Sequence, residues 1–301
     1  MKNTNQPKHN KWQNDGTKLI VFMTACTANP TKLGTNTSND FEEERTGTGT
    51  NEWSESTYNI CKGCSHNCLY CYARWMAERF NRVNSASEWG IERVDENKVN
   101  KSNRLFKGVV MFPSSHDITP NILPAALKTL RNMLQAGNKV LIVSKPHLKV
   151  IQALCRELAG FKDQIQFRFT IGTLNETTAK LWEPGAPTPK ERIEALKHAF
   201  QLGFRTSVSM EPMLDDVAGM IKLINTIAPY VNKTIWLGKM NEINRRVDQT
   251  RPDVRAAVAK IQEEQSDASI LRLYFELASD SKIRWKDSIK NVLEKYEISI
   301  A

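Results

Sequence analysis

The sequence predicts an α/β protein in which parallel strands and crossover helices form a full or partial (β/α) barrel over residues 56–301. From residue 56 onward, short apolar or β-branched runs alternate seven times with segments of helical spacing. Such alternation is typical of a parallel sheet with crossover helices. Residues 1–55 are mostly polar and rich in Thr, Asn and Gly. We expect a flexible N-terminal extension there, because little apolar surface offsets the entropy of ordering it.

The expected strands are short runs of apolar and β-branched residues. They are STYNI (56–60), KGVVMFP (107–113), KVLIVSK (139–145), QIQFRFTIG (164–172), RTSVSMEPM (205–213), KTIWLGKM (233–240) and LRLYFELAS (271–279). Between them, apolar residues three or four positions apart predict helices after the cysteines and at 122–137, 147–160, 189–203, 216–228, 252–265 and 287–296. Gly137 at the end of the first of these ranges is typical of a helix C-terminus.

A (β/α) barrel carries its reactive groups at the carboxyl ends of the strands, where the strand-to-helix loops emerge. This rule selects the residues that directly follow each expected strand. They are Cys61–Cys71, Ser114–Asp117, Lys145, Thr170–Thr173, Glu211, Lys239 and Ser279–Lys282. Glu276 joins this set as a further pocket candidate, although each of these charged side chains could equally be solvated.

The charge of the chain is uneven. The net charge is +9, with −1 on residues 1–57 and +10 on the remainder. A basic body fits a polyanionic partner such as nucleic acid, although it also serves solubility. No apolar run approaches the ~20 residues that span a bilayer, and the polar start lacks the apolar core of a secretory signal. We therefore expect a cytoplasmic protein with no membrane contact.

Four of the six cysteines lie in the stretch CKGCSHNCLYCYARW, at Cys61, Cys64, Cys68 and Cys71. In a reducing compartment such clustering indicates a metal site rather than disulfides. A four-thiolate zinc site is one interpretation, but only three residues separate the two Cys-x2-Cys pairs, whereas zinc ribbons use about 12–20. Alternatively, Cys64, Cys68 and Cys71 hold three corners of a [4Fe-4S] cluster and leave the fourth iron open. Cys61 then has no assigned role.

The stretch GCSHNCLYCYAR resembles the signature of the radical S-adenosylmethionine (AdoMet) superfamily, with Tyr70 as the aromatic residue before the last cysteine. The resemblance implies that Cys64, Cys68 and Cys71 ligate a [4Fe-4S] cluster, that AdoMet binds the open iron, and that Tyr70 lies near the adenine. It also implies a 5′-deoxyadenosyl radical that abstracts hydrogen from a substrate, and an electron donor such as flavodoxin or ferredoxin.

Residues from about 60 to 215 further resemble spore photoproduct lyase and its uncharacterised relatives, through NCLYCYARW, FPSSHDI, IVSKPH, QFRFTIG, LWEPGAPTPKERIEAL and GFRTSVSMEPM. The resemblance places Lys145 near the AdoMet carboxylate, Thr170 near the methionine moiety and Asp117 in the region that receives the amino group. From the residues alone, Lys145 could be an exposed strand-end lysine, Thr170 a β-former, and Asp117 the N-cap of the next helix. WEPG (182–185) is predicted to be a turn.

The resemblance also contains a departure. The lyase has a hydrogen-donor cysteine in the second-strand loop, and Ser114 stands at that position here. An alcohol O–H bond is much stronger than a thiol S–H bond, so Ser114 cannot readily return hydrogen to a carbon radical, and thymine-dimer repair itself is not expected. Cys155, among apolar residues of an amphipathic helix, is expected to be core. Ser114 and Glu211 remain the candidate catalytic residues.

Three functions are compatible with these observations. The first is radical modification or repair of a nucleic acid or nucleotide. The second is a radical enzyme that acts on a peptide or a small metabolite, and the third is a non-catalytic zinc or iron–sulfur protein. The four arginines of NRRVDQTRPDVR (244–255) could contact phosphates, although a solvated helix approach also explains them. Trp285 could stack on a base.

Overall fold

The computed structural model describes Phe41, Arg45 and residues 47–300. Most of the predicted extension, together with Cys26, lies outside the described residues. Seven parallel strands form one sheet in sequence order, and no pairing among the described residues joins the first to the last. The strands are β1 (Ser56–Thr57), β4 (Val109–Phe112), β5 (Lys139–Ser144), β6 (Ile165–Thr170), β7 (Arg205–Met210), β8 (Ile235–Leu237) and β9 (Ile283–Trp285). The predicted fold class, an α/β partial barrel, is confirmed.

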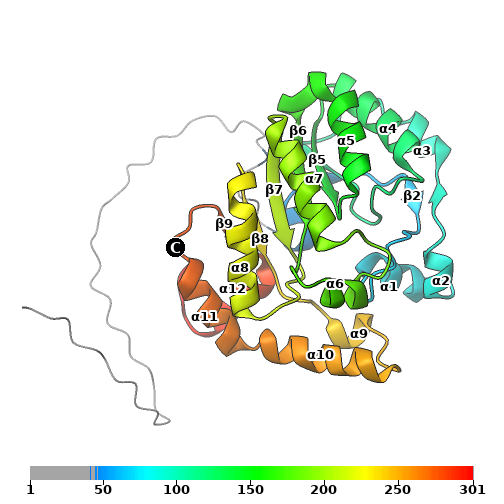
Figure 1. Cartoon of the computed structure of the whole chain (residues 1–301). Coiled ribbons are helices and arrows are strands. Elements are labelled where there is room, and N and C mark those ends of the chain that lie inside the picture. Colours follow the sequence, from blue (N-terminus) through cyan, green and yellow to red (C-terminus); the bar gives the residue numbers. More distant parts are fainter. Residues whose placement is uncertain (1–40, 42–44, 46, 301) are drawn as a thin grey trace, which may run out of the picture. The chain divides into compact units, whose positions relative to one another are not determined.

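Helices connect the strands, and Figure 1 shows several of them along one face of the sheet. The longer ones are α1 (Tyr72–Arg79), α4 (Leu123–Gln135), α5 (Leu148–Glu157), α7 (Pro189–Gln201), α8 (Val217–Ile227), α10 (Pro252–Glu264), α11 (Asp267–Leu277) and α12 (Asp287–Lys295). Local chemistry sets their starts. Thr188, for example, accepts a hydrogen bond from the Glu191 N–H and is followed by Pro189, a residue favoured in the first helical turn.

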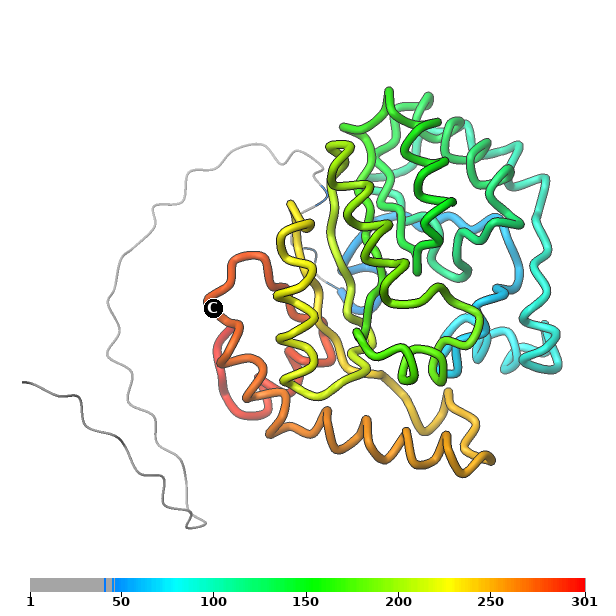
Figure 2. The backbone as a smooth tube through the Cα atoms, in the orientation of Figure 1, coloured from blue at the N-terminus to red at the C-terminus, as the bar shows by residue number. Residues whose placement is uncertain are grey.

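Shorter elements lie between these units. They are the 3₁₀ helices η1 (Gly49–Glu52), η2 (Ala159–Gln164) and η3 (Ala228–Tyr230), the helices α2 (Ala86–Trp89), α3 (Glu96–Asn100), α6 (Glu176–Trp182) and α9 (Ile243–Arg246), and the hairpin of β2 (Cys61–Lys62) with β3 (Arg93–Val94). Figure 2 follows the chain through successive strand–helix units, each beside the previous one. None of the helices in the described part of the chain is long and apolar enough to cross a membrane.

Alternate residues of each strand face opposite sides of the sheet. Val110, Phe167 and Val208 belong to the large core that also includes residues of α4, α5, α7 and α8. Burial of a side chain of this size stabilises the fold by about 1.5–3 kcal/mol. Cys155 of α5 is buried in the same core, which confirms the expectation for it.

The other face of the sheet encloses a smaller cluster and a buried cation. Trp53, just after η1, packs with Met111 of β4 in this cluster. The Arg168 guanidinium of β6 lies 4.8 Å from the Trp53 ring centroid and 5.1 Å from that of Trp236. The segment that precedes β1 therefore packs against this inner face of the sheet.

The predicted strand at 271–279 is wrong, because this segment belongs to helix α11. Its sequence fits both the two-residue period of a strand and the 3.6-residue period of a helix. Alternate Leu271, Leu273 and Phe275 suggest a strand, whereas the residues that the structure buries, including Leu273 and Tyr274, share a helical face. Ser266 accepts a hydrogen bond from the Ser269 N–H at the helix start, which favours the helix.

The seventh strand is β9 instead, and this changes the position of several predicted residues. Trp285 is 6% exposed and packs against Tyr274 at 5.2 Å between ring centroids, so it is a core residue and does not present its face to a base. Lys282 precedes β9, and its ammonium donates to the Ala228 and Val231 carbonyls. Lys282 is therefore at the amino end of a strand. Asp280 lies in the same turn, and Glu276 is exposed on α11.

Candidate active site at the carboxyl ends of the strands

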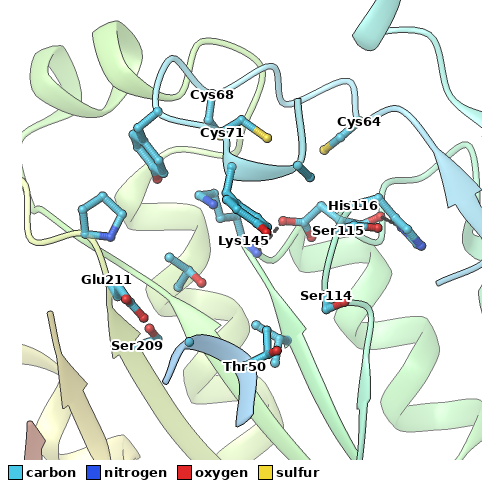
Figure 3. A pocket seen from close by; sticks show the side chains of 18 of the residues that line it. Thr50, Cys64, Cys68, Cys71, Ser114, Ser115, His116, Lys145, Ser209 and Glu211 are labelled. Carbon is cyan, nitrogen blue, oxygen red and sulfur yellow. Dashed lines mark hydrogen bonds between the residues drawn. The ribbon is translucent and has the colours of Figure 1, made fainter. Parts of the chain in front are cut away.

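A cavity of about 590 Å³ opens at the carboxyl ends of the strands. All of the residues proposed from the sequence as cluster ligands, AdoMet contacts or catalytic groups line it: Cys64, Cys68, Tyr70, Cys71, Ser114, Asp117, Lys145, Thr170 and Glu211. Figure 3 shows the three cysteines on one side and Ser114, Thr50 and Glu211 on the opposite side. Residues more than 100 positions apart in the sequence therefore share one cavity, because parallel strands bring their carboxyl ends to one edge.

Backbone hydrogen bonds fasten the cysteine loop, residues 61–71, on both sides. The Cys64 N–H donates to the Trp89 carbonyl at 2.9 Å, and the Leu69 N–H donates to the Trp182 carbonyl at 2.8 Å. The loop is thus tied to α2 and to the end of α6. Its position does not depend on the cysteines alone.

Two glycines permit this close packing. Gly63 has a φ of +91°, and a Cβ there would lie 2.2 Å from the Ile91 carbonyl oxygen. Gly185, in the turn after α6, would place a Cβ 2.1 Å from the Ser65 carbonyl oxygen. Neither position accepts a side chain without movement of the backbone, so both turns hold the loop against its neighbours.

The three thiols suit a multi-iron cluster. Burial raises the pKa of Cys68 to about 12 and raises that of Cys64 well above its usual value. A buried thiolate therefore needs a compensating positive charge, which bound iron supplies. Among the residues that the structure describes, no three His, Cys, Asp or Glu side chains converge on a position for a single metal ion. Thiolates on a [4Fe-4S] cluster bind different irons and need no such convergence.

Cys61 is separate from these thiols. It pairs with Val94 in the β2–β3 hairpin, and its thiol is within hydrogen-bonding distance of the Lys62 and Gly63 carbonyls. It is not among the described residues that line the cavity. The structure therefore does not bring the four sulfurs together as a tetrahedral zinc site requires.

Asp117 connects the loop after β4 to the end of β5. Its carboxylate accepts hydrogen bonds from the Lys145 N–H at 2.8 Å and from the Ser144 hydroxyl, and lies 3.2 Å from Nδ1 of His66. Burial opposes ionisation, but His66 and these donors hold the pKa of Asp117 well below its usual range. Helix α4 begins at Leu123 with Ile122 at its N-cap, so the interpretation of Asp117 as that N-cap is wrong.

Glu183 is one of the charged residues that sequence reasoning missed. It is 2% exposed and lies in WEPG, which forms the predicted turn. Its carboxylate is 2.5 Å from Nη2 of Arg192 and 3.9 Å from Nζ of Lys145, and it accepts a hydrogen bond from the Tyr70 hydroxyl. Two cations lie beside this one carboxylate, and Lys145, which lines the cavity, places there a positive charge that can attract an anionic group.

Lys145 remains charged in this setting. Burial alone would lower its pKa, but Cys68, Glu183 and Asp117 raise it above its usual value. Its ammonium lies 5.6 Å from the Tyr70 ring centroid. The alternative reading of Lys145 as an exposed strand-end lysine is wrong, because its side chain is 16% exposed.

The remaining predicted residues are held by polar contacts. The Ser114 hydroxyl accepts a hydrogen bond from the Asn59 amide at 2.8 Å, and the Ser114 N–H donates to the same side chain. Thr170 ends β6, and its carbonyl accepts from Arg192 at 3.3 Å. Lys239 also lines the cavity. Asn59, just after β1, thus holds both the hydroxyl and the backbone N–H of Ser114, just after the neighbouring strand β4.

A second buried charge cluster closes the cavity opposite the cysteines. Nζ of Lys286 lies 2.5 Å from Glu52, 3.5 Å from Glu211, and donates to the Gly49 carbonyl. Burial and the Glu52 charge raise the pKa of Glu211 to about 6, although Lys286 acts in the opposite direction. A carboxyl group with this pKa can accept or release a proton near neutral pH.

Glu211 makes stability depend on pH. The folded protein keeps the Glu211 proton up to about pH 6, whereas the unfolded chain loses it near 4.5. As the pH rises between these values, the free energy of unfolding falls by about 2 kcal/mol on this account. Glu211→Gln is expected to remove this slope, so that the variant gains stability relative to the parent as the pH rises from 4.5 to 7. Urea unfolding at several pH values measures it, and a difference that is constant with pH would contradict the assignment.

Some signal for the missed residues exists in the sequence. Arg192 lies on the apolar stripe of α7, four positions before Leu196, where a charged side chain must be buried. A buried arginine in turn requires a carboxylate. Nothing local marks Glu52, the last residue of η1, or Lys286, just after β9, because a charged side chain at such a position is ordinarily exposed. Their burial follows only from how η1 and β9 come together.

Comparison with known proteins agrees with this site. The family model of the radical SAM superfamily matches residues 58–217, more than half of the chain. An uncharacterized protein of Acidianus two-tailed virus is 33% identical over 166 residues, which cover 52% of this chain and 54% of that protein. An uncharacterized protein of Methanocaldococcus jannaschii is 27% identical over 177 residues, 56% and 64% of the two chains. The matches thus span between about half and two thirds of these curated relatives.

Two solved structures are also similar. Spore photoproduct lyase complexed with dinucleoside spore photoproduct matches with a TM-score of 0.48 and 14% identity, over 84% of this chain and 76% of that one. Streptococcus suis SuiB bound to S-adenosylmethionine matches with a TM-score of 0.45 and 11% identity, over 76% and 49%. The family match covers the cysteine loop and the strand ends that follow it. This chain belongs to the radical SAM superfamily, whose members are radical enzymes that use S-adenosylmethionine and an iron–sulfur cluster.

Proposed function

We propose that this protein is a radical enzyme in which Cys64, Cys68 and Cys71 hold a [4Fe-4S] cluster with one iron open to AdoMet. One observation supports this most strongly: the three thiols share a single cavity with Tyr70, Lys145 and the other predicted AdoMet contacts. When bound, the cluster and AdoMet supply a 5′-deoxyadenosyl radical that takes hydrogen from a substrate. An acidic one-electron donor such as flavodoxin or ferredoxin would reduce the cluster.

The residues around the thiols would bind and orient AdoMet. Lys145, beside Cys68, carries a positive charge that Glu183 only partly balances, so it would hold the AdoMet carboxylate. Thr170, at the end of β6, would contact the methionine moiety. Glu183 accepts a hydrogen bond from the Tyr70 hydroxyl and so fixes the ring that would lie near the adenine.

Asp117 has a more demanding position. Its carboxylate already accepts from Ile118, Ser144 and Lys145 and pairs with His66. Its two oxygens provide about four acceptor sites, three of which accept hydrogen bonds from Ile118, Ser144 and Lys145, so an ammonium group would share the fourth with His66. It would therefore receive the AdoMet amino group while it holds the cysteine loop against β5.

For the substrate we propose a nucleic acid or a nucleotide. The +10 charge outside residues 1–57 and the motifs shared with spore photoproduct lyase support this class. Ser114 lies in the cavity where that lyase has its donor cysteine, and among the described residues the thiols that line the cavity are Cys64, Cys68 and Cys71. We therefore propose a reaction whose last step does not use hydrogen from a further thiol among these residues.

The test is product formation under anaerobic conditions. The full chain is reconstituted with iron and sulfide and incubated with AdoMet and dithionite, and 5′-deoxyadenosine is measured by chromatography. We expect this product, and a faster rate of formation when the correct single-stranded DNA or RNA is added. A colourless, zinc-loaded protein that forms no 5′-deoxyadenosine would show that the chain is a non-catalytic metal-binding protein instead. Product formed only with peptides or small metabolites would rule out the nucleic-acid substrate.

A further inference from the structure

Helix α1 presents exposed aromatic side chains directly after the cysteine loop. Tyr72 is 53% exposed and Phe80 is 54% exposed, and Trp75 between them is half-buried. Large aromatic residues are normally placed to bury their rings. An exposed group of them at one position therefore indicates a surface that binds something.

Four arginines lie against these rings. Arg79 is 5.4 Å from the Trp75 ring centroid and 5.8 Å from that of Phe80, and Arg82 is 5.5 Å from Phe80. From α9, Arg245 lies 5.5 Å from the Trp75 ring and Arg246 lies 5.0 Å from the Tyr72 ring. These seven residues form what we call the aromatic–arginine face: Tyr72, Trp75, Arg79, Phe80, Arg82, Arg245 and Arg246. Figure 1 shows α1 and α9 near each other.

The face is strongly basic. Arg245 is paired with Glu242 at 3.1 Å. In the described part of the chain, no carboxylate lies within ion-pairing distance of Arg79, Arg82 or Arg246. Stacking holds these guanidinium groups beside the rings without neutralising them, so their charge is available to an anionic partner.

The face is continuous with the cavity. Tyr72 and Arg246 belong to both, and Tyr72 directly follows Cys71. A polymer that lay on this face would therefore enter the cavity beside the thiols. Two of the four arginines come from the run at 244–255, for which the sequence alone left phosphate contact open but favoured simple solvation as the commoner explanation.

We propose that the aromatic–arginine face binds a single-stranded segment of the nucleic-acid substrate and guides one nucleotide into the cavity, a proposal that rests on the nucleic-acid function above. Rings that stack on bases, interleaved with cations that contact phosphates, are the two components of single-strand binding. The chemistry also requires an exposed nucleotide, because a base inside a duplex cannot reach a buried radical site. An acidic redox protein would use the charges but would leave Tyr72 and Phe80 without a partner.

The test compares exposed residues of the face with matched residues elsewhere. The full, reconstituted chain is titrated into a fluorescein-labelled single strand of about a dozen nucleotides, and binding is followed by fluorescence anisotropy at several salt concentrations. Arg79→Glu with Arg82→Glu is expected to weaken binding at least ~10-fold and to lower the slope of log K against log salt by about 1.4, because each lost phosphate contact in a single strand contributes ~0.7. Phe80→Ala, which keeps the charge, is expected to weaken binding about fivefold or more through lost stacking.

The control is a double variant of equal charge change. Arg156→Glu with Arg272→Glu alters two exposed arginines of α5 and α11, neither of which lines the cavity, and we expect a change in affinity of less than about twofold. Thermal unfolding of every variant verifies the fold, and all substituted side chains are exposed.

The outcomes separate the surface from the function. If the parent binds the strand and both face variants bind it equally well, this surface assignment is wrong and the nucleic-acid function survives. If the parent does not bind single strands even at low salt, both fail, while deoxyadenosine formation still tests the radical chemistry. A third outcome is that the arginine variant binds the strand normally, but flavodoxin reduces its cluster more slowly than that of the parent while dithionite reduces both equally. In that case the face belongs to the electron donor and the proposal is overturned.

Discussion

Replacement of Cys68 by alanine is expected to abolish 5′-deoxyadenosine formation, and Cys64→Ala and Cys71→Ala are expected to do the same. Each thiolate would bind one iron, so the loss of one leaves a cluster site with two protein ligands. The site is buried, and no other thiol among the described residues lines the cavity. The measurement is iron and sulfide content after reconstitution, the charge-transfer absorption of the cluster, and product formed from AdoMet.

Cys61→Ala is the matched control, because Cys61 lies in the same loop but is hydrogen-bonded within the β2–β3 hairpin. This variant is expected to retain the cluster and to form product at the parent rate. Cys155→Ala, in the outer core, should lose some stability but keep the cluster. Loss of the cluster in Cys61→Ala, with retention in Cys64→Ala, would move the ligand set by one cysteine and contradict the C-x3-C-x2-C assignment.

Glu183→Ala is expected to destabilise the protein by roughly 3–5 kcal/mol, the usual cost of removing one partner of a buried ion pair. Arg192, 1% exposed, would keep its charge without the carboxylate that lies 2.5 Å away. Lys145 and the Tyr70 hydroxyl would lose the same partner. Urea unfolding at pH 7 measures the free energy of unfolding, and the affinity for AdoMet is expected to fall because Lys145 and Tyr70 are no longer positioned.

Glu194→Ala provides the comparison for this second prediction. Glu194 pairs with Lys197 at 2.8 Å on the exposed side of α7, and exposed pairs contribute about 0–1 kcal/mol. Glu183→Gln keeps the shape of the side chain and one hydrogen-bond acceptor. Its loss of stability should lie between those of Glu183→Ala and Glu194→Ala. An equal loss of stability in Glu183→Ala and Glu194→Ala would show that the buried network contributes nothing beyond a surface pair.

Most of the fold could be predicted because its elements are local patterns. The apolar spacing of α4, α5, α7 and α8 and the β-branched runs of β4 to β7 each lie within about fifteen residues. The helix α11 was mistaken for a strand because LRLYFELAS satisfies both periods. Packing against the core decided which face of α11 is buried: Leu273 and Tyr274 are buried, whereas Phe275 remains 59% exposed.

The sequence by itself determined the three closely spaced cysteines, the order of the first six strands of the parallel sheet, and the strand-end positions of Lys145, Thr170 and Glu211. Each of these depends on spacing along a short stretch or on the regular alternation of strands and helices. Only the tertiary structure decided which charges are buried together. Tyr70 and Glu183 are 113 residues apart, and Lys286 and Gly49 are 237 residues apart. Local periodicity reports which residues share a face of one element, whereas the burial of a charge depends on a distant partner that compensates its lost hydration.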